Sequence, residues 1–145
     1  MTARPETRRW DDVQPGDALP ELVVAVTATV IVAGAIATRD FMPVHHDKAY
    51  ANAQGAPDIF MNILSDTGYC GRFLTDWAGP EAMVKRLAIR LGAPAFPGST
   101  LTYTGSVTAK PAPGLVEVTF RATNDLGDHV SGAATLDLPV RGARR

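Results

Sequence analysis

Asp40 and His45 are the two residues whose types and spacing most clearly suggest chemistry in this chain. They lie five residues apart, with Pro43 between them. Proline lacks a backbone N–H and fixes its own φ, so it favours a bent loop in which the carboxylate and the imidazole converge. Both groups can take up and release protons, and together they could hold one water molecule. The spacing therefore predicts a general acid/base site.

The segments around this loop must position the pair. Residues 22–37 are largely apolar and rich in Val, Thr and Ile, which favours a buried strand or bent strand pair over a membrane span. Residues 49–54 suggest a short helical turn. A long helix is expected over residues 58–78, because Asp58 is a favourable first residue and Gly79-Pro80 is a favourable stop.

The expected long helix has two unlike faces. Apolar and small residues recur every three to four positions on one face: Phe60, Ile63, Leu64, Thr67, Cys70, Gly71, Leu74 and Ala78. The other face is polar: Asn62, Ser65, Asp66, Tyr69, Arg72 and Asp76. Gly68 and Gly71 weaken the helix but would allow close contact with a neighbouring element.

Beyond this helix the apolar period changes to two, which predicts four strands with one apolar face each. They span about residues 86–91, 100–108, 116–121 and 130–138. One strand region, a long helix and four strands predict an α+β fold, an antiparallel sheet with a helix on its apolar face. We expect one domain over residues 18–140, a flexible N-terminal segment over 1–17 and a basic tail over 141–145.

The composition argues against several functional classes. A formal net charge of −1 and a pI near 6.3 give no electrostatic reason to expect nucleic acid or an anionic membrane as a partner. Cys70 is the single cysteine, so no internal disulfide can form, which suits a reducing cytoplasm. The first 20 residues contain arginines but no apolar stretch, unlike a secretory signal.

The sequence around the pair resembles a known family over about residues 13–140. Asp40-x-x-Pro43-Val44-His45 is similar to the Gly-Asp-x-Asn-Pro-hydrophobic-His motif of the MaoC-like, R-specific enoyl-CoA hydratases. The resemblance is closest to one subgroup, the small MaoC-like subunit of the actinobacterial steroid side-chain enoyl-CoA hydratase. The blocks that carry it are Ala37-Thr38-Arg39-Asp40-Phe41, Val44-His45-His46-Asp47, Asp58-Ile59-Phe60, Asn62-Ile63-Leu64, Asp66-Thr67-Gly68, Thr75-Asp76-Trp77-Ala78-Gly79-Pro80 and Leu126-Gly127-Asp128-His129-Val130.

This resemblance implies a hotdog fold, in which an antiparallel sheet wraps around a long central helix. It implies that Asp40 and His45 hold the water that adds to an enoyl-CoA, without specifying which of them is the base. A backbone N–H at the start of the helix, near Met61 and Asn62, would bind the thioester oxygen. The substrate would be a bulky, steroid side-chain enoyl-CoA, with CoA as part of the substrate and no metal or redox cofactor. A second MaoC-like chain would complete an α2β2 assembly.

Three positions depart from the family motif. Arg39 replaces the motif glycine, and Met42 replaces its asparagine. Met61-Asn62 stands where many relatives have His-Gly. A backbone donor survives a change of side chain, so the oxyanion site is still expected near Asn62.

Two other functions remain open. Hotdog thioesterases often use a carboxylate on the central helix, a role that Asp66 could take in place of its expected role as a hydrogen-bonded interface residue. Alternatively, the chain could be a non-catalytic scaffold subunit in which Asp40 and His45 are vestigial.

The remaining candidate residues have structural interpretations. His46 is expected to flank the site, and Asp47 to cap the following turn. A metal cluster of these residues with Asp40 and His45 is not expected, because adjacent histidines in an extended loop point apart. Cys70 is expected in the core, Trp77 in packing at the helix end, and His129 at the surface or a subunit contact.

Overall fold

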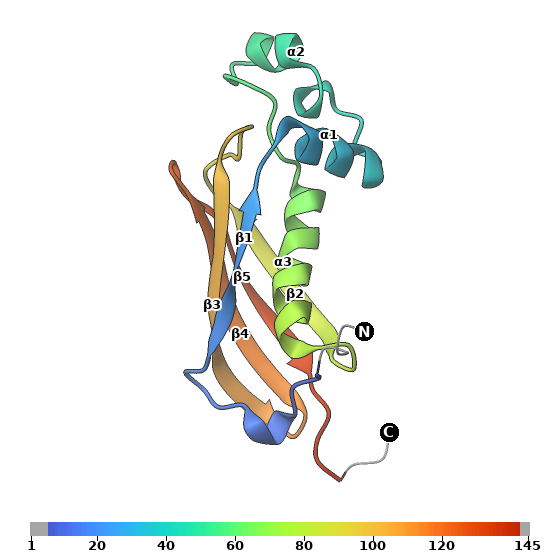
Figure 1. Ribbon diagram of the computed structural model, residues 1–145, viewed down its shortest axis with the longest axis vertical. Helices are drawn as coiled ribbons and strands as arrows, with labels where there is room; N and C mark the ends of the chain where they lie inside the picture. Colours follow the sequence, from blue (N-terminus) through green and yellow to red (C-terminus); the bar gives the residue numbers. More distant parts are fainter. Residues whose placement is uncertain (1–5, 143–145) are drawn as a thin grey trace.

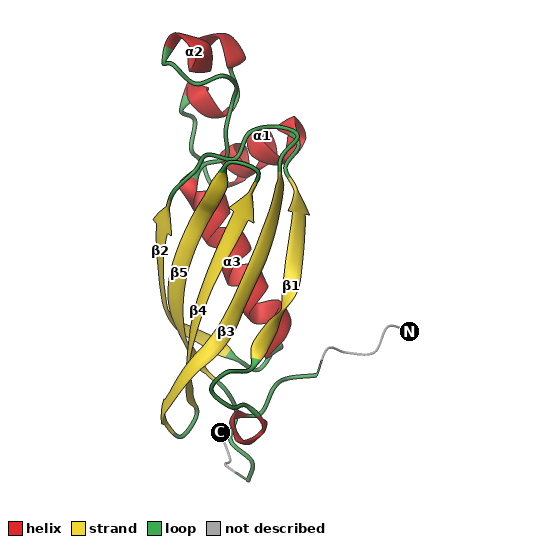
Figure 2. Ribbon diagram, turned by 90° about the vertical axis from the view of Figure 1, so that its left-hand side faces the viewer, coloured by secondary structure: helices red, strands yellow, loops and turns green. Residues whose placement is uncertain are grey.

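A long helix, α3 (Ile63–Ala78), lies against one face of a curved sheet in the computed structural model, which describes residues 6–142 (Figure 1). The sheet has five antiparallel strands in the order β1-β3-β4-β5-β2, with α3 behind them in Figure 2. The strands are β1 (Ala18–Ala25), β2 (Met83–Leu91), β3 (Thr100–Ala112), β4 (Leu115–Asn124) and β5 (Gly127–Asp137). The predicted α+β layering and the four later strands are confirmed.

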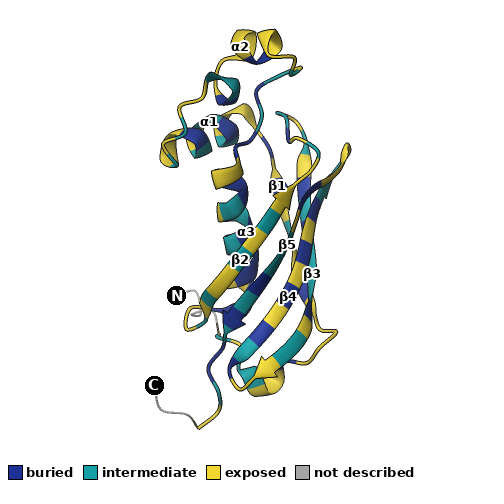
Figure 3. Cartoon of the chain, turned by 180° about the vertical axis from the view of Figure 1, so that it is seen from behind, coloured by how far each residue is buried: buried dark blue, intermediate teal, exposed yellow. Residues whose placement is uncertain are grey.

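The core lies between α3 and the inner face of the sheet. Along β4, buried Val118 and Phe120 alternate with exposed Thr119 and Arg121, a period-two pattern that is visible in Figure 3. From α3, Phe73 packs near Phe120, with ring centroids 6.1 Å apart. Burial of such apolar side chains is the main force that holds the helix on the sheet.

The prediction of strand over residues 22–37 is wrong for its second half. The strand β1 ends at Ala25, and α1 (Ala28–Ala37) follows. The Oγ1 of Thr27 caps this helix by accepting a hydrogen bond from the Val30 N–H at 3.1 Å. Because β-branched residues lower helix propensity only slightly, this cap and the burial of Ile31 and Ala35, four residues apart, suffice to favour a helix.

The long helix begins five residues later than predicted. Asn62, not Asp58, is its N-cap. Asp58 instead accepts hydrogen bonds from the Ile59 N–H at 2.8 Å and from Lys48 at 2.8 Å. Residues 58–62 therefore have a non-helical conformation and lead into the start of α3. The expected stop at Gly79 is confirmed.

The two faces of α3 also differ from the prediction. Ile63 and Leu64, assigned to the buried face, are 50% and 48% exposed. Asp66, assigned to the polar face, is fully buried. Cys70 and Trp77 are buried as predicted. The apolar spacing fits two adjacent stripes of the helix, and only tertiary contacts decide which stripe faces the sheet.

Residues 6–17 pack against the domain, which differs from the expected flexible segment over residues 1–17. Val13 is buried, and the 3₁₀ turn Trp10–Asp12 places the Trp10 Nε1–H 3.0 Å from the Leu115 carbonyl oxygen. Arg141, from the expected basic tail, pairs with Asp12 in the same region. Residues 1–5 and 143–145 of these two predicted segments lie outside the described residues.

Candidate active site

Asp40 and His45 converge at one end of the sheet, in the loop between α1 and α2 (Lys48–Ala53). The Nε2 of His45 lies 3.4 Å from the Oδ2 of Asp40. Pro43 begins the 3₁₀ turn Pro43–His45, which bends the chain between the two residues. The bent loop expected from Pro43, the short helical turn after it and the cap by Asp47, which accepts from the Tyr50 N–H at 3.0 Å, are confirmed.

The carbonyl of Phe60 fixes the orientation of the His45 ring. The Nδ1 of His45 lies 2.7 Å from this carbonyl oxygen. A carbonyl only accepts hydrogen bonds, so Nδ1 carries a proton and Nε2 faces Asp40. The Phe60 ring also packs edge-on against the imidazole, with centroids 5.1 Å apart. Since Nε2 of a neutral imidazole and a carboxylate oxygen are both acceptors, a water molecule can donate to both groups.

Asp40 is held in its ionised form. It accepts hydrogen bonds from the Asn62 side-chain amide at 2.9 Å and from the Met42 N–H at 3.3 Å. The Asn62 amide is the main reason that the pKa of Asp40 lies below its ordinary value. Desolvation opposes this shift, while the Met42 N–H and nearby His45 add to it. The Asp40 side chain is 24% exposed, so a substrate can reach it.

The side chain of Asn62 has a role that the sequence did not reveal. Its Oδ1 accepts from the Ser65 N–H at 3.1 Å, which caps α3. Its Nδ2 donates to both Asp40 and the Oγ1 of Thr38, each at 2.9 Å. The preference of asparagine for helix N-caps was the one available signal for this role. Asn62 thereby joins the helix start to the carboxylate.

Only one of the two predicted oxyanion residues keeps a suitable backbone donor. The Met61 N–H already donates to the Ala95 carbonyl at 3.0 Å, so the prediction of Met61 as a donor is wrong. The Asn62 N–H has no hydrogen-bond partner within residues 6–142. This amide lies at the N-terminus of α3, where the helix dipole favours a developing negative charge.

Arg39, which stands at the position of the motif glycine, has a left-handed backbone conformation. Its φ is 60°, the one positive value outside glycine in the part of the chain that the structure describes. Glycine reaches this left-handed region without strain, whereas another residue in this region lowers the stability of the folded state by about 1 kcal/mol. Arg39 therefore adopts a conformation that suits glycine better than arginine.

Asp66 and His129 form a second, buried pair. The Asp66 Oδ1 lies 2.8 Å from the His129 Nε2, and the His129 Nδ1 lies 2.6 Å from the Ala93 carbonyl oxygen. His129 is only 2% exposed, so the prediction of a surface or subunit contact is wrong. A position beside a hairpin turn favours exposure of His129, and the local sequence does not indicate a partner 63 residues away. His46, by contrast, is exposed beside the site.

An apolar groove of about 460 Å³ runs between α1 and α3. Small and apolar residues make most of its lining: Val30, Ala33, Gly34, Ala37, Leu64 and Gly68. Thr38, which bonds to Asn62, also lines it, so the groove reaches the Asp40 site. The close approach of the helices requires Gly34, because a Cβ there would clash with Ser65.

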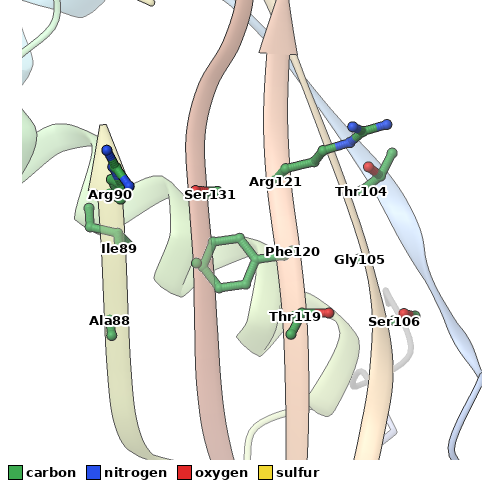
Figure 4. Close-up of a pocket in the computed structure, with 11 residues that line it drawn as sticks. Ala88, Ile89, Arg90, Thr104, Gly105, Ser106, Thr119, Phe120, Arg121 and Ser131 are labelled. Atoms are coloured by element: carbon green, nitrogen blue, oxygen red, sulfur yellow. The ribbon is translucent and has the colours of Figure 1, made fainter. Parts of the chain in front are cut away.

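A larger concavity, about 640 Å³, lies on the outer face of the sheet (Figure 4). Its hydroxyl and guanidinium side chains include Thr104, Thr119, Arg121 and Arg90. None of the groups described above for the Asp40 site lines it. The described residues contain no group of three or more His, Cys, Asp or Glu side chains arranged to hold a metal ion. Within residues 6–142, no helix has the length and apolar character needed to cross a bilayer.

The sheet, its central helix and the Asp–His loop define a hotdog-fold hydratase, and this chain belongs to the MaoC-like family of such enzymes. It is 50% identical over 126 residues to the beta subunit of the 3-oxo-4,17-pregnadiene-20-carboxyl-CoA hydratase of Mycobacterium tuberculosis. That match covers 87% of this chain and 95% of the relative. No family model matches the chain.

Solved structures agree with this assignment. A chain of the ChsH1–ChsH2 complex from Mycobacterium tuberculosis is 48% identical, with a TM-score of 0.82 over 84% of this chain and 95% of that one. The (R)-hydratase of A. caviae, involved in PHA biosynthesis, has a TM-score of 0.81 over 88% of this chain and 98% of that one. At 22% identity, this second likeness concerns the fold alone. The predicted family and hotdog fold are confirmed.

Proposed function

We propose that this chain is the catalytic subunit of an enoyl-CoA hydratase acting on a steroid side-chain thioester in steroid (cholesterol) degradation. The observation that carries the proposal is the approach of the Asp40 Oδ2 to the His45 Nε2, 3.4 Å, at the start of α3. One short segment holds both groups: the Phe60 carbonyl binds His45, and the Asn62 side chain binds Asp40. The same segment presents the free Asn62 N–H.

The proposed reaction uses these three groups together. The Asn62 N–H donates to the thioester carbonyl, which draws electrons from the double bond and makes the β-carbon electrophilic. Water held by Asp40 and His45 adds its oxygen to the β-carbon, while one of the pair takes its proton. The electrons of the double bond pass to the carbonyl oxygen. When they return, the α-carbon takes a proton from Asp40 or His45. The product is the 3-hydroxyacyl-CoA.

The proposed substrate has a bulky, apolar acyl group. The groove between α1 and α3 offers about 460 Å³ of mainly apolar space that reaches Thr38, beside the site. The curated relative is named for a pregnadiene carboxyl-CoA, a steroid thioester. A steroid nucleus would remove apolar groove surface from water, which favours binding.

The proposed partner is a second MaoC-like chain, in an α2β2 assembly. The related solved structure is a complex of two proteins. Here β2 is an edge strand with Met83 53% exposed, and α3 presents Ile63 and Leu64, each about half exposed. Exposed edges and apolar stripes of this kind are usually covered by another chain. We place the assembly in the cytoplasm, consistent with the free thiol of buried Cys70.

Two rival functions are less well supported by the geometry. A thioesterase that uses Asp66 needs this carboxylate at the substrate, yet Asp66 is fully buried and bonded to His129. A scaffold subunit needs no ordered acid/base pair, yet Asp40 and His45 are held by specific hydrogen bonds.

The test is reconstitution of the full chain with its partner, with a steroid enoyl-CoA as substrate. We expect loss of the enoyl chromophore without release of free CoA, and turnover only when both chains are present. Release of free CoA in place of hydration would establish the thioesterase. Undiminished hydration by the partner alone would establish the scaffold. Light scattering of the mixture would give the stoichiometry, expected to be two copies of each chain.

A further inference from the structure

The buried Asp66–His129 pair is a chemical feature that the proposed reaction does not use. Asp66 is 0% exposed, and His129 is 2% exposed. Both ring nitrogens of His129 face oxygen acceptors, Asp66 Oδ1 at 2.8 Å and the Ala93 carbonyl at 2.6 Å. Only the imidazolium form of His129 can donate to both at once, and opposite an ionised Asp66 it forms a buried ion pair.

Stability alone gives a weak reason for such a pair. Removing two charges from water is costly, and an apolar pair of similar size is often equally stable or more so. The Asp66 Oδ2 has no hydrogen-bond partner among the described residues, so His129 provides most of the compensation for the buried carboxylate. A role in specifying one local geometry is therefore the better explanation.

The pair connects α3, β5 and the loop between β2 and β3. Asp66 lies in the first turn of α3, and its N–H donates to the Asn62 carbonyl at 3.1 Å. His129 lies on β5 and holds the loop between β2 and β3 through Ala93. The same loop holds residue 61, because the Met61 N–H donates to the Ala95 carbonyl at 3.0 Å.

A continuous set of contacts thus leads from the pair to the reacting groups. Asn62 lies between the two anchored points, Met61 and Asp66, and its side chain donates to Asp40. The Phe60 carbonyl, two residues earlier, orients His45. A shift of the helix start would therefore move Asp40, His45 and the free Asn62 N–H together.

We propose that Asp66 and His129 are positioning residues for hydration: they fix the start of α3, and through Asn62 and Phe60 they set the geometry of Asp40 and His45. This inference rests on the proposed function of that site. It assigns no contact with substrate to either residue of the buried pair.

The charge state of His129 gives the positioning a dependence on pH. Burial lowers the pKa of His129, but the hydrogen bond and charge of Asp66 and the Ala93 carbonyl raise it by more. The stabilisation is therefore complete below the ordinary pKa of 6.5 and is lost as pH rises through the higher folded-state pKa. The ionisable groups that interact with Asp66 include Cys70 from α3 and Tyr103 from β3, and Tyr69 from α3 interacts with Tyr103.

Burial keeps Cys70 and Tyr103 neutral across the pH range in which His129 loses its proton. Burial, with a contribution from Asp66, raises the pKa of Cys70 to about 12. Burial also raises the pKa of Tyr103. A transition above pH 6.5 in this cluster would therefore report the imidazolium of His129 rather than these groups.

The main test uses Asp66→Asn and His129→Gln in the full chain with its partner. Asp76→Asn removes the same charge from an exposed site on the same helix and is the matched control. We expect the two pair variants to lower kcat by about tenfold with KM nearly unchanged, because small displacements of reacting groups cost rate. The double variant should be no slower than the slower single variant, since either change breaks the same unit. The control should match the wild type.

A second readout does not depend on turnover. Nuclear magnetic resonance of the full chain should show shifted signals of the His45 ring and the Asn62 side-chain amide in Asp66→Asn, but not in Asp76→Asn. In the wild type, the same two signals should move on alkaline titration with the midpoint of His129. This titration tests the inference even if the variants fail to fold or the proposed hydration is not observed.

The inference is overturned if folded Asp66→Asn keeps wild-type kcat and unshifted His45 and Asn62 signals. It is also overturned if His129 titrates without any response of those signals. Absence of hydration in the wild-type complex, with the coupled signals present, would refute the proposed function but leave the positioning intact.

Discussion

The chain contains two Asp–His pairs, and their difference shows what makes such a pair a candidate site. Asp40 and His45 are 3.4 Å apart, with side chains 24% and 9% exposed. Asp66 and His129 are 2.8 Å apart, with side chains 0% and 3% exposed. In the buried pair both imidazole nitrogens face protein acceptors within hydrogen-bond distance, whereas in the open pair the Nε2 of His45 faces a carboxylate that is partly exposed. The open pair can exchange protons with a substrate, and the buried pair can only hold structure.

The buried pair should dominate stability. In His129→Leu the carboxylate of Asp66 stays buried without its imidazolium, which should cost roughly 3–5 kcal/mol of unfolding free energy. Replacement of both residues by leucine should recover most of this loss, since no buried charge remains. Urea unfolding at neutral pH measures both. A loss below about 1 kcal/mol in the single variant would show that the pair carries no charge.

The open pair should dominate activity. His45→Asn should lower turnover by ~10²-fold or more, about 2.7 kcal/mol, because the general acid or base is lost. Its amide can still donate to the Phe60 carbonyl, so stability should change little. The assay is steroid enoyl-CoA hydration in the complex, with His46→Asn, an exposed neighbour, as the control. Equal losses in the two variants would contradict the assignment of His45.

Asn62 joins the helix start to the open pair, so its loss should affect both properties by smaller amounts. Asn62→Ala removes the cap of α3, which should cost about 1 kcal/mol of stability. It also removes the main cause of the lowered pKa of Asp40, so the acid limb of the kcat profile should move to higher pH. Asn52→Ala, which deletes two exposed hydrogen bonds elsewhere, should leave the profile unchanged. An unmoved acid limb in Asn62→Ala would refute this role.

Arg39 offers the smallest expected effect. Arg39→Gly should raise stability by up to about 1 kcal/mol, because glycine adopts a φ of 60° without strain. Arg39→Ala keeps the strain and removes the same side chain, so it is the matched control. Thermal unfolding of both variants decides the point. If the alanine variant is the more stable one, the left-handed conformation is not strained.

The open pair could be predicted because its determinants are local. Asp40, Pro43 and His45 lie within one short loop, and the chemistry of this loop follows from their types and spacing. The later strands could be predicted for a similar reason, since a period of two is a property of neighbouring residues. The surrounding motif then indicated the family.

The buried pair and the helix start depend on contacts that the sequence does not display. His129 is buried because Asp66, 63 residues earlier, meets it across the packed core. The sequence predicts too early a start for α3, because Asp58, a good cap by type, bonds to Lys48 and Ile59 instead. The β-branched residues of α1 favour a strand, but this preference is weak, and tertiary packing produces a helix instead.

The most direct measurement compares Asp40→Asn and Asp66→Asn, each assayed for hydration rate in the complex and for unfolding free energy. We expect Asp40→Asn to lower the rate by ~10²-fold while the unfolding free energy stays within about 1 kcal/mol of the wild type. Asp66→Asn should lose more than about 1 kcal/mol of stability and only about tenfold in rate. If Asp40→Asn instead hydrates the substrate at the wild-type rate, the open pair is not the site of the chemistry.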